Sequence, residues 1–509
     1  MENRSNFFVR INGNLWIVLA ATALLLTGCG SPKKYTVPQI RAEYEEASPV
    51  PAKQVSPGKN RRDRPPDSTE AGLDFPLTLS RVIDITISNN PNLQQAVHRI
   101  SQAKAMKDLA DSAFWPFVGL YTEYMQGDTP SAFWYKKMDG RNVRPEDFNA
   151  PDDFNDPGWF ENYETGLEAR MNLFNGGKDY LGRKMAGQAI DISRLDRQSI
   201  VNSLTARVIS AFYEVLAARE FVDIAEEAVA TVSEQLRVIR VQYEGGGALK
   251  SDMLSLKVRL ARTKESLVKS RNRFQLAKAA LANLMGLDPD EFSCRRDFLT
   301  KTGEAPIEVP DTYRDGIVQA LSNRPELKKV REQLIKSRMG MDAAKTGYLP
   351  RVDLMGKYYV DDPAMDYDWN KDNWTAAVMF NWDLFAGFSR KARVDKADAI
   401  VKEMLAADRQ ATLDVKLDVK NAYLNLEAAR AKYKVAASSV ESAEESYRLV
   451  KQHYDGGSVT ITRYLEAELD RNRARIRAAA AFYDKIKANA DLARAIGKWA
   501  VRSPQPFER

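Results

Sequence analysis

The side chains that most often carry out chemistry are scarce in this chain. Among 509 residues there are two histidines, His98 and His453, and two cysteines, Cys29 and Cys294. Zinc sites and disulfide frameworks need clusters of such residues, and a histidine is mainly informative when it has a partner. Neither histidine is expected to have a chemical role, and the sequence shows no nucleophile–base set, metal cluster or phosphate loop. We therefore predict that the protein is not an enzyme and has no cofactor.

Cys29 is the one residue for which the sequence indicates a covalent modification. An apolar run of about 12 residues, 15–26, suits the core of a signal peptide at 1–28 and is too short to span a bilayer as a helix. The following Leu26-Thr27-Gly28-Cys29 resembles the bacterial lipobox, in which the cysteine is diacylated and becomes the first residue of the mature chain. Gly30 implies, by that resemblance, sorting to the outer membrane. The alternative is a plain signal peptide followed by a cysteine that is there by chance.

The charge balance argues against a nucleic-acid partner. The chain has 75 basic and 69 acidic side chains, a formal net charge of +6, and charged residues make up 28% of it. Lys and Arg are mixed with Glu and Asp along the sequence, without a strongly basic patch that contains aromatic residues. Residues 29–76 are rich in Pro, Lys, Arg and Ser and have no apolar period, so they are predicted to form an extended linker.

Two glycine-rich stretches, 211 positions apart, organise the rest of the chain. They are Tyr243-Glu244-Gly245-Gly246-Gly247 and Tyr454-Asp455-Gly456-Gly457-Ser458. Glycine readily takes the positive φ that ends a helix. Ser251 and Thr462 are polar residues that can cap the helices that follow. Both stretches are therefore predicted to be the tips of helical hairpins.

An internal repeat surrounds these tips. Asn90-Pro91 corresponds to Arg324-Pro325 at an offset of 234, and beyond the predicted strands the offset becomes 211. The change of 23 residues lies inside the first strand hairpin. The first repeat spans 77–311, with a barrel hairpin 117–173, a long helix 178–243, a return helix 251–286 and a segment 287–311. The second spans 312–500, with a helix 325–349, a barrel hairpin 351–385, a long helix 388–454 and a return helix 462–498, and a tail 501–509 follows.

The long helices have the clearest hydrophobic period. From Val201 to Tyr243 the apolar positions step by three and four, and the same positions plus 211 are apolar or aromatic except Thr412. This period predicts a coiled-coil seam, in a helix about 100 Å long at 1.5 Å per residue. A second apolar stripe, which includes Phe212 and Leu216, indicates neighbours on two sides. Each long helix should therefore be a stave in a ring of helices.

The predicted strands alternate between apolar and polar residues. Leu167, Ala169 and Met171, for example, alternate with Glu168 and Arg170. Arms of about 10 residues with aromatic residues near their ends are typical of a transmembrane β-barrel. The alternative is a soluble sandwich. Four strands cannot close a barrel, and open sheet edges are not tolerated in lipid, so copies of the chain must join. The acidic, aromatic connections 125–162 and 361–373 would face the cell exterior.

From Leu77 to Ala500 the chain resembles the TolC-like outer-membrane efflux proteins. The resemblance rests on the duplicated order of helix, proline, two strands, long helix, glycine-rich turn and helix, and on Leu-x-x-x-x-Gly at the repeat ends. It implies a mainly α-helical fold with a transmembrane β-barrel portion: a homotrimer that forms a periplasmic α-barrel and a twelve-stranded β-barrel, with four strands per chain. The segment 287–311 would wrap the middle of the tunnel, where Cys294 is expected to be a buried free thiol.

The resemblance also gives roles to the two tips. Gly245, Gly246, Gly247, Gly456, Gly457 and Ser458 would dock on a periplasmic adaptor (membrane fusion) protein bound to an inner-membrane transporter. In the family an acidic residue just after the tip glycines helps to hold the entrance shut, and Asp252 stands there. Its repeat mate is Arg463, a departure, with Glu466 on the same helix face. We expect these three residues to form a periplasmic gate; the alternative is that each is a solvated residue at a helix start.

The function that joins these features is conduction. We predict a lipid-anchored, barrel-inserted exit duct of a tripartite efflux or type I secretion system, passive and with a wet, polar lumen. The alternative is a periplasmic coiled-coil scaffold or adaptor lipoprotein, which would leave the strands as soluble sheet. The sequence does not identify the exported substrate, which could be a drug, a metal ion, a peptide or a protein.

Overall fold

The computed structural model describes residues 77–148, 155–290, 307–364 and 369–500. The predicted signal peptide, Cys29, the linker 29–76, Cys294 and the tail 501–509 lie outside the described residues. Most of the segment 287–311 does as well. The predictions for these parts stay predictions.

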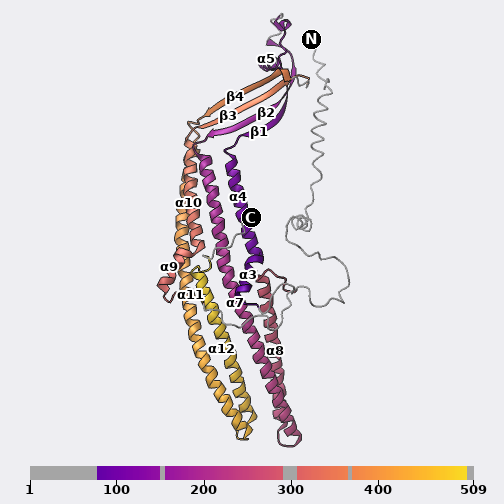
Figure 1. The fold of residues 1–509 in the computed structure, drawn as a ribbon, viewed down its shortest axis with the longest axis vertical. Coiled ribbons are helices and arrows are strands. Elements are labelled where there is room, and N and C mark those ends of the chain that lie inside the picture. Colours follow the sequence, from indigo (N-terminus) through magenta and orange to yellow (C-terminus); the bar gives the residue numbers. More distant parts are fainter. Residues whose placement is uncertain (1–76, 149–154, 291–306, 365–368, 501–509) are drawn as a thin grey trace, which may run out of the picture. The chain divides into compact units, whose positions relative to one another are not determined.

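Two copies of one arrangement follow each other along the chain (Figure 1). The first contains α3 (Leu79–Asn89), α4 (Pro91–Ser112), β1 (Phe117–Gly127), β2 (Phe160–Phe174), α7 (Lys178–Glu244) and α8 (Lys250–Leu284). The second contains α9 (Tyr313–Asn323), α10 (Pro325–Lys345), β3 (Arg351–Asp362), β4 (Asp372–Asn381), α11 (Ser389–Asp455) and α12 (Ile461–Ala495). The long helices α7 and α11 each have 67 residues.

Several bounds differ from the prediction by a few residues. Helix α10 ends at Lys345, before a short 3-10 turn at Thr346–Tyr348 and Pro350, because the residue before a proline is disfavoured in a helix. Strand β4 ends at Asn381, four residues earlier than expected. Helix α9 and the elements inside the first strand hairpin, α5 (Pro130–Asp139) and η1 (Pro145–Phe148), were not predicted.

Each long helix has neighbours along its whole length. Helices α4 and α8 pack on successive parts of α7, whereas α10 and α12 contact both α7 and α11 (Figure 1). Most seam positions of α7 are buried, among them Val208, Val215 and Val222, whereas Val201 is half-buried and Tyr243 exposed at the two ends of the seam. One eighteen-residue window of α7 is long and apolar enough to cross a membrane, but 56% of that window is buried inside the protein, as expected for a core helix.

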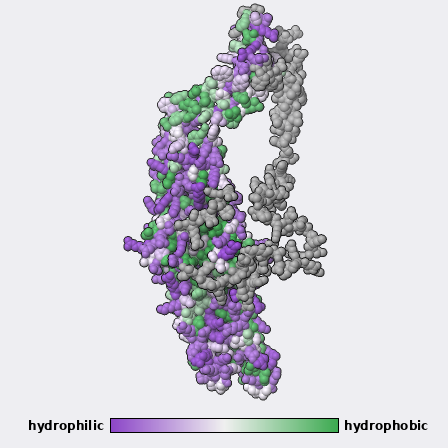
Figure 2. Space-filling view, in the orientation of Figure 1, coloured by the Kyte–Doolittle hydropathy of each residue, from purple (hydrophilic) through white to green (hydrophobic). Residues whose placement is uncertain are grey.

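The four strands form one antiparallel sheet in the order β1-β2-β3-β4. Leu120, Leu167, Tyr358 and Trp374 lie in one row across it and are 76%, 50%, 41% and 76% exposed. The opposite face carries polar residues such as Glu168, paired with Lys357. Figure 2 shows hydrophobic side chains gathered over the strands. A large exposed apolar face on a sheet marks a surface that meets lipid or a partner.

Candidate functional site

The two glycine-rich tips have the same backbone structure. Gly246 and Gly457 have φ values of +78° and +75°, as the sequence predicts for helix-ending glycines. The amides of Gly246 and Gly457 donate to the carbonyls of Tyr243 and Tyr454 at 3.0 and 2.9 Å. The next residues of the two tips, Gly247 and Ser458, also have equivalent hydrogen bonds. Their amides donate to the carbonyls of Gln242 and His453 at 2.7 and 2.8 Å. The duplicated sequence therefore produces two equivalent tips.

The predicted caps at Ser251 and Thr462 are wrong. Helix α8 begins at Lys250 after Leu249, which makes no side-chain cap, so Ser251 lies inside the first turn. Helix α12 begins at Ile461, and its cap is Thr460, whose hydroxyl accepts from the Arg463 amide at 3.4 Å. In both cases the helix starts earlier than the prediction assumed.

The structure places Asp252 and Arg463 in the first turns of α8 and α12, beside the tips, and Glu466 in the second turn of α12. Arg463 and Glu466 form an exposed ion pair of 3.5 Å within α12. Among the described residues, no ion pair joins Asp252 to either of them. Asp252 instead lies near Tyr454 of the other hairpin. Burial raises the pKa of the Tyr454 hydroxyl, and the negative charges of Asp455 and Asp252 raise it further.

A tyrosine cluster of the second hairpin packs against the first hairpin just above the tips. The rings of Tyr454 and Tyr464 stack at 5.0 Å, and the Tyr447 and Tyr464 hydroxyls are 3.0 Å apart. Tyr464 is 1% exposed and packs into an apolar cluster formed by α7, α8 and α12. Burial, followed by the hydrogen bond with Tyr447, raises the pKa of Tyr464 well above its usual range. The two hairpins of one subunit are therefore held together close to the predicted gate.

Glu468 lies one helical turn beyond Tyr464 and was missed by the sequence analysis. It is 1% exposed, and neither of its carboxyl oxygens makes a well-formed hydrogen bond in the described part of the chain, although the Asn472 side chain is close enough to lower its pKa. Burial raises the pKa of this carboxyl, against the opposing effect of Arg259 and Arg471. Arg471 itself donates to Glu227 of α7 at 2.8 Å. In the sequence, this site is indicated only by the position of Glu468 one helical turn after Tyr464, and the burial of that tyrosine is seen only in the structure.

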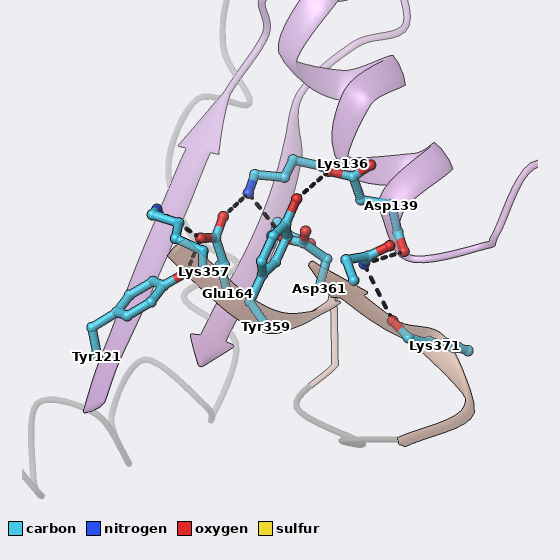
Figure 3. A network of polar contacts seen from close by, with 10 residues as sticks. Tyr121, Lys136, Asp139, Glu164, Lys357, Tyr359, Asp361 and Lys371 are labelled. Carbon is cyan, nitrogen blue, oxygen red and sulfur yellow. Dashed lines mark hydrogen bonds and ion pairs between the residues drawn. The ribbon is translucent and has the colours of Figure 1, made fainter. Parts of the chain in front are cut away.

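A second polar network, also missed, lies at the far end of the strands (Figure 3). Lys136 of α5 donates to Glu164 of β2 and, at 2.9 Å, to Asp361 of β3. Glu164 also accepts from Tyr121 and from Lys357, the latter at 3.3 Å. Because this network links α5 to β2 and to β3, α5 is held against the sheet.

Four antiparallel strands with an exposed apolar face, continued by two long helical hairpins, are the construction of an outer-membrane channel. The chain belongs to the outer membrane efflux protein family, whose family model matches residues 82–287 and 316–498. The family and the fold class that the resemblance implies are thereby confirmed.

Individual proteins agree with this assignment. The pyoverdine export outer membrane protein OpmQ of Pseudomonas putida is 20% identical over 96% of this chain and 98% of its own length. The alkaline protease secretion protein AprF of Pseudomonas aeruginosa is 22% identical over 82% and 84%. The Campylobacter jejuni CmeC outer membrane channel has the same fold, with a TM-score of 0.68, 18% identity and coverage of 82% of this chain and 85% of that one.

The protein is therefore an outer-membrane exit duct of an efflux or secretion system, with a large periplasmic portion. Channels of this family conduct solutes passively.

Proposed function

We propose that three copies of this chain, anchored through acylated Cys29, form one continuous duct across the periplasm and the outer membrane. The observation that carries the proposal is the open sheet. Strands β1 and β4 are its edges, and its apolar face is exposed. An open edge in lipid leaves backbone groups without partners, so the edges of neighbouring copies must pair to close a barrel. A soluble scaffold or adaptor would gain nothing from this exposed face.

The duct works with a periplasmic adaptor protein and an inner-membrane transporter, and the tips are the docking ends. The tip residues Gly456, Gly457 and Ser458 are exposed. Gly245, Gly246 and Gly247 are equally exposed at the other tip. Equivalent turns at the ends of two hairpins give each subunit two similar docking points. The proposed duct is not assigned a particular cargo, because the relatives named above export a pyoverdine and a protease, which differ greatly in size.

Asp252, Arg463 and Glu466 form the periplasmic gate in this proposal. The charge of Asp252 on one hairpin acts on Tyr454 of the other, while Arg463 and Glu466 place a positive and a negative charge side by side on α12. In a closed ring of three subunits these charges meet those of the next copy. Separation of the hairpins would break such contacts and widen the entrance.

Site-specific crosslinking tests the docking end, and gels of the same fractions test the trimer. Ser458→Cys, labelled with a photoactivatable thiol reagent in cells, should capture an adaptor protein and, through it, an inner-membrane transporter. Glu441→Cys, an exposed site 14 residues before the end of α11, is the matched control and should capture neither. The same outer-membrane fractions should contain a heat-dissociable trimer. A monomeric band before heating, or equal capture from both sites, contradicts the proposal.

A further inference from the structure

The first strand hairpin carries a long connection that the second lacks. Residues 128–159 separate β1 from β2, which is 32 residues, whereas residues 363–371, nine residues, separate β3 from β4. The difference of 23 equals the change in repeat offset from 234 to 211. The extra residues therefore lie between β1 and β2, and this connection includes α5.

Helix α5 and the turn after it contact three neighbouring strands. Lys136 reaches β2 and β3, as described above. The carbonyl of Asp139 accepts from the Asn373 side chain of β4 at 2.9 Å, and its carboxylate accepts from the Tyr359 hydroxyl of β3 at 3.3 Å. Arg141 donates to the Asp372 carbonyl at 2.8 Å. This segment thus crosses the sheet from β2 to β4.

The strand side chains that α5 contacts belong to the polar face of the sheet. Glu164 pairs with Asp361, and Tyr359 pairs with Asn373, in register rows that alternate with the apolar rows. The apolar face must meet lipid, so the polar face lines the bore. In the proposed trimer, helix α5 therefore lies over the lumen at the outer end of the barrel, whereas the sequence predicts only that this connection faces the cell exterior.

Lys136 is the main attachment. Its side chain is 15% exposed, and those of its partners Glu164 and Asp361 are 9% and 0% exposed. Asn162 donates to the same Asp361 carboxylate. Breaking a buried ion pair by removal of one partner is far more costly than its loss from the surface, because the remaining charge is left without a counter-ion. One lysine thus bridges carboxylates of two adjacent strands.

We propose that α5 is a lid over the outer mouth of the pore, pinned by Lys136 to Glu164 and Asp361, that slows the inward passage of large hydrophilic solutes. This inference rests on the proposed trimer, in which three such helices project into one bore. The export path then has a restriction at its outer end, separate from the gate at the helical tips. Outgoing cargo would displace the lid by breaking the Lys136 contacts.

A cysteine in the bore below the lid provides the test. Ala377 lies on β4, on the same face as Asn373 and four residues further from α5. Ala377→Cys in a Cys294→Ser background is labelled from outside intact cells with two impermeant reagents. One is a small charged thiosulfonate, and the other is a long-chain polyethylene glycol maleimide. The Cys294→Ser chain without Ala377→Cys gives the blank.

The small reagent should label Ala377→Cys, and the bulky one should label it slowly. Lys136→Met should speed the bulky reagent by about tenfold or more, which corresponds to about 1.4 kcal/mol of closing free energy. The matched control is Lys137→Met, because Lys137 pairs with Asp147 of the same connection and not with a strand. It should leave the rate low. Trimers on gels confirm that each variant assembles.

Two results would overturn the lid. One is fast labelling of the chain with intact Lys136 by the bulky reagent, and the other is an equal increase from Lys137→Met. Failure of the small reagent to label Ala377→Cys in any variant has a different meaning: the polar face then does not line a bore open to the outside, and the proposed duct falls together with the lid.

Discussion

Asn90 and Arg324 occupy equivalent positions in the two repeats and bind equivalent backbone atoms. The side-chain amide of Asn90 donates to the carbonyl of Leu284 at 2.8 Å, and the Arg324 guanidinium donates to the carbonyl of Ala495 at 3.1 Å. Leu284 and Ala495 are the last residues of the return helices α8 and α12. The joint between the first helices and the return helix is therefore kept in both repeats, although a neutral amide in one is a cation in the other.

The cation in the second joint needs a counter-charge, which Asp418 supplies. Arg324 donates to Asp418 at 2.6 Å and Arg494 donates to it at 3.0 Å. Asp418→Asn should destabilise the folded protein by about 2 kcal/mol or more, because Arg324 is 9% exposed and would keep only its second carboxylate partner, Glu326. Thermal unfolding of the detergent-solubilised protein measures the loss. Asp408→Asn, which also changes a carboxylate of α11 but removes a pair with Arg331 of α10 whose side chain is 51% exposed, should cost less than about 1 kcal/mol.

The same site predicts a dependence on pH. Burial alone would raise the pKa of Asp418, but hydrogen bonds and charge from Arg494 and Arg324 outweigh it and hold the pKa below its ordinary value of 3.8. Its contribution to stability is therefore present above pH 3.8 and is lost as the pH falls through the lowered pKa. The difference in stability between Asp418→Asn and the unsubstituted protein should shrink in that acid range. A constant difference down to the lowest pH tested would contradict this role.

Steric crowding explains why glycine stands at the end of the Leu-x-x-x-x-Gly motif of each repeat. Gly286 has a φ of +73°, and a Cβ there would lie 2.6 Å from the Asn89 carbonyl oxygen. Gly286→Ala should therefore destabilise the protein by more than the roughly 1–3 kcal/mol of backbone strain alone. Gly246→Ala is the control, because its φ of +78° is similar but nothing lies within 4 Å of the added Cβ. Equal losses in thermal unfolding would show that the contact with Asn89 does not matter.

The sequence predicts features that depend on residues close together in the chain. The tip glycines and the seam from Val201 to Tyr243 are of this kind, since turn geometry and helical period are local. The repeat then extends each prediction to the second copy. The α5 network is different, because Lys136 and Asp361 are 225 positions apart. Alternation assigns Asp361 to a polar face but does not identify the residue that meets it there.

The burial of Glu468 also depends on residues far away in the chain and could not be predicted from the sequence. It leads to a testable prediction about stability. Its pKa is raised by burial above the ordinary 4.5, with Arg259, Arg471 and Glu227 as the charges that face it. Between pH 4.5 and the raised pKa the folded state holds more protons than the unfolded state, so stability falls as the pH rises. Glu468→Gln should therefore stabilise the protein by about 1–3 kcal/mol near pH 8, the usual cost of an unsatisfied buried polar group. It should give no gain near pH 4, because both states are then protonated at this site.

Thermal unfolding at the two pH values measures this difference. Asp470→Asn on the same helix is the control, because its carboxylate is 69% exposed and it should change stability little at either pH. If Glu468→Gln destabilises the protein near pH 8, the ionised carboxylate serves as a needed counter-ion for Arg259 and Arg471. That result would reverse the assignment of Glu468 as a destabilising buried acid.

Arg463→Ala tests the proposed periplasmic gate. The Arg463–Glu466 pair is exposed and spans three residues of one helix, so it should contribute at most about 1 kcal/mol to stability. Its loss should instead loosen the entrance, raising single-channel conductance in planar bilayers and the uptake of large antibiotics by cells. Arg448→Ala is a matched control, because the Arg448–Glu445 pair has the same spacing and similar exposure but lies within α11, before the tip. Unchanged conductance and uptake in Arg463→Ala, or an equal rise in Arg448→Ala, would remove Arg463 from the gate.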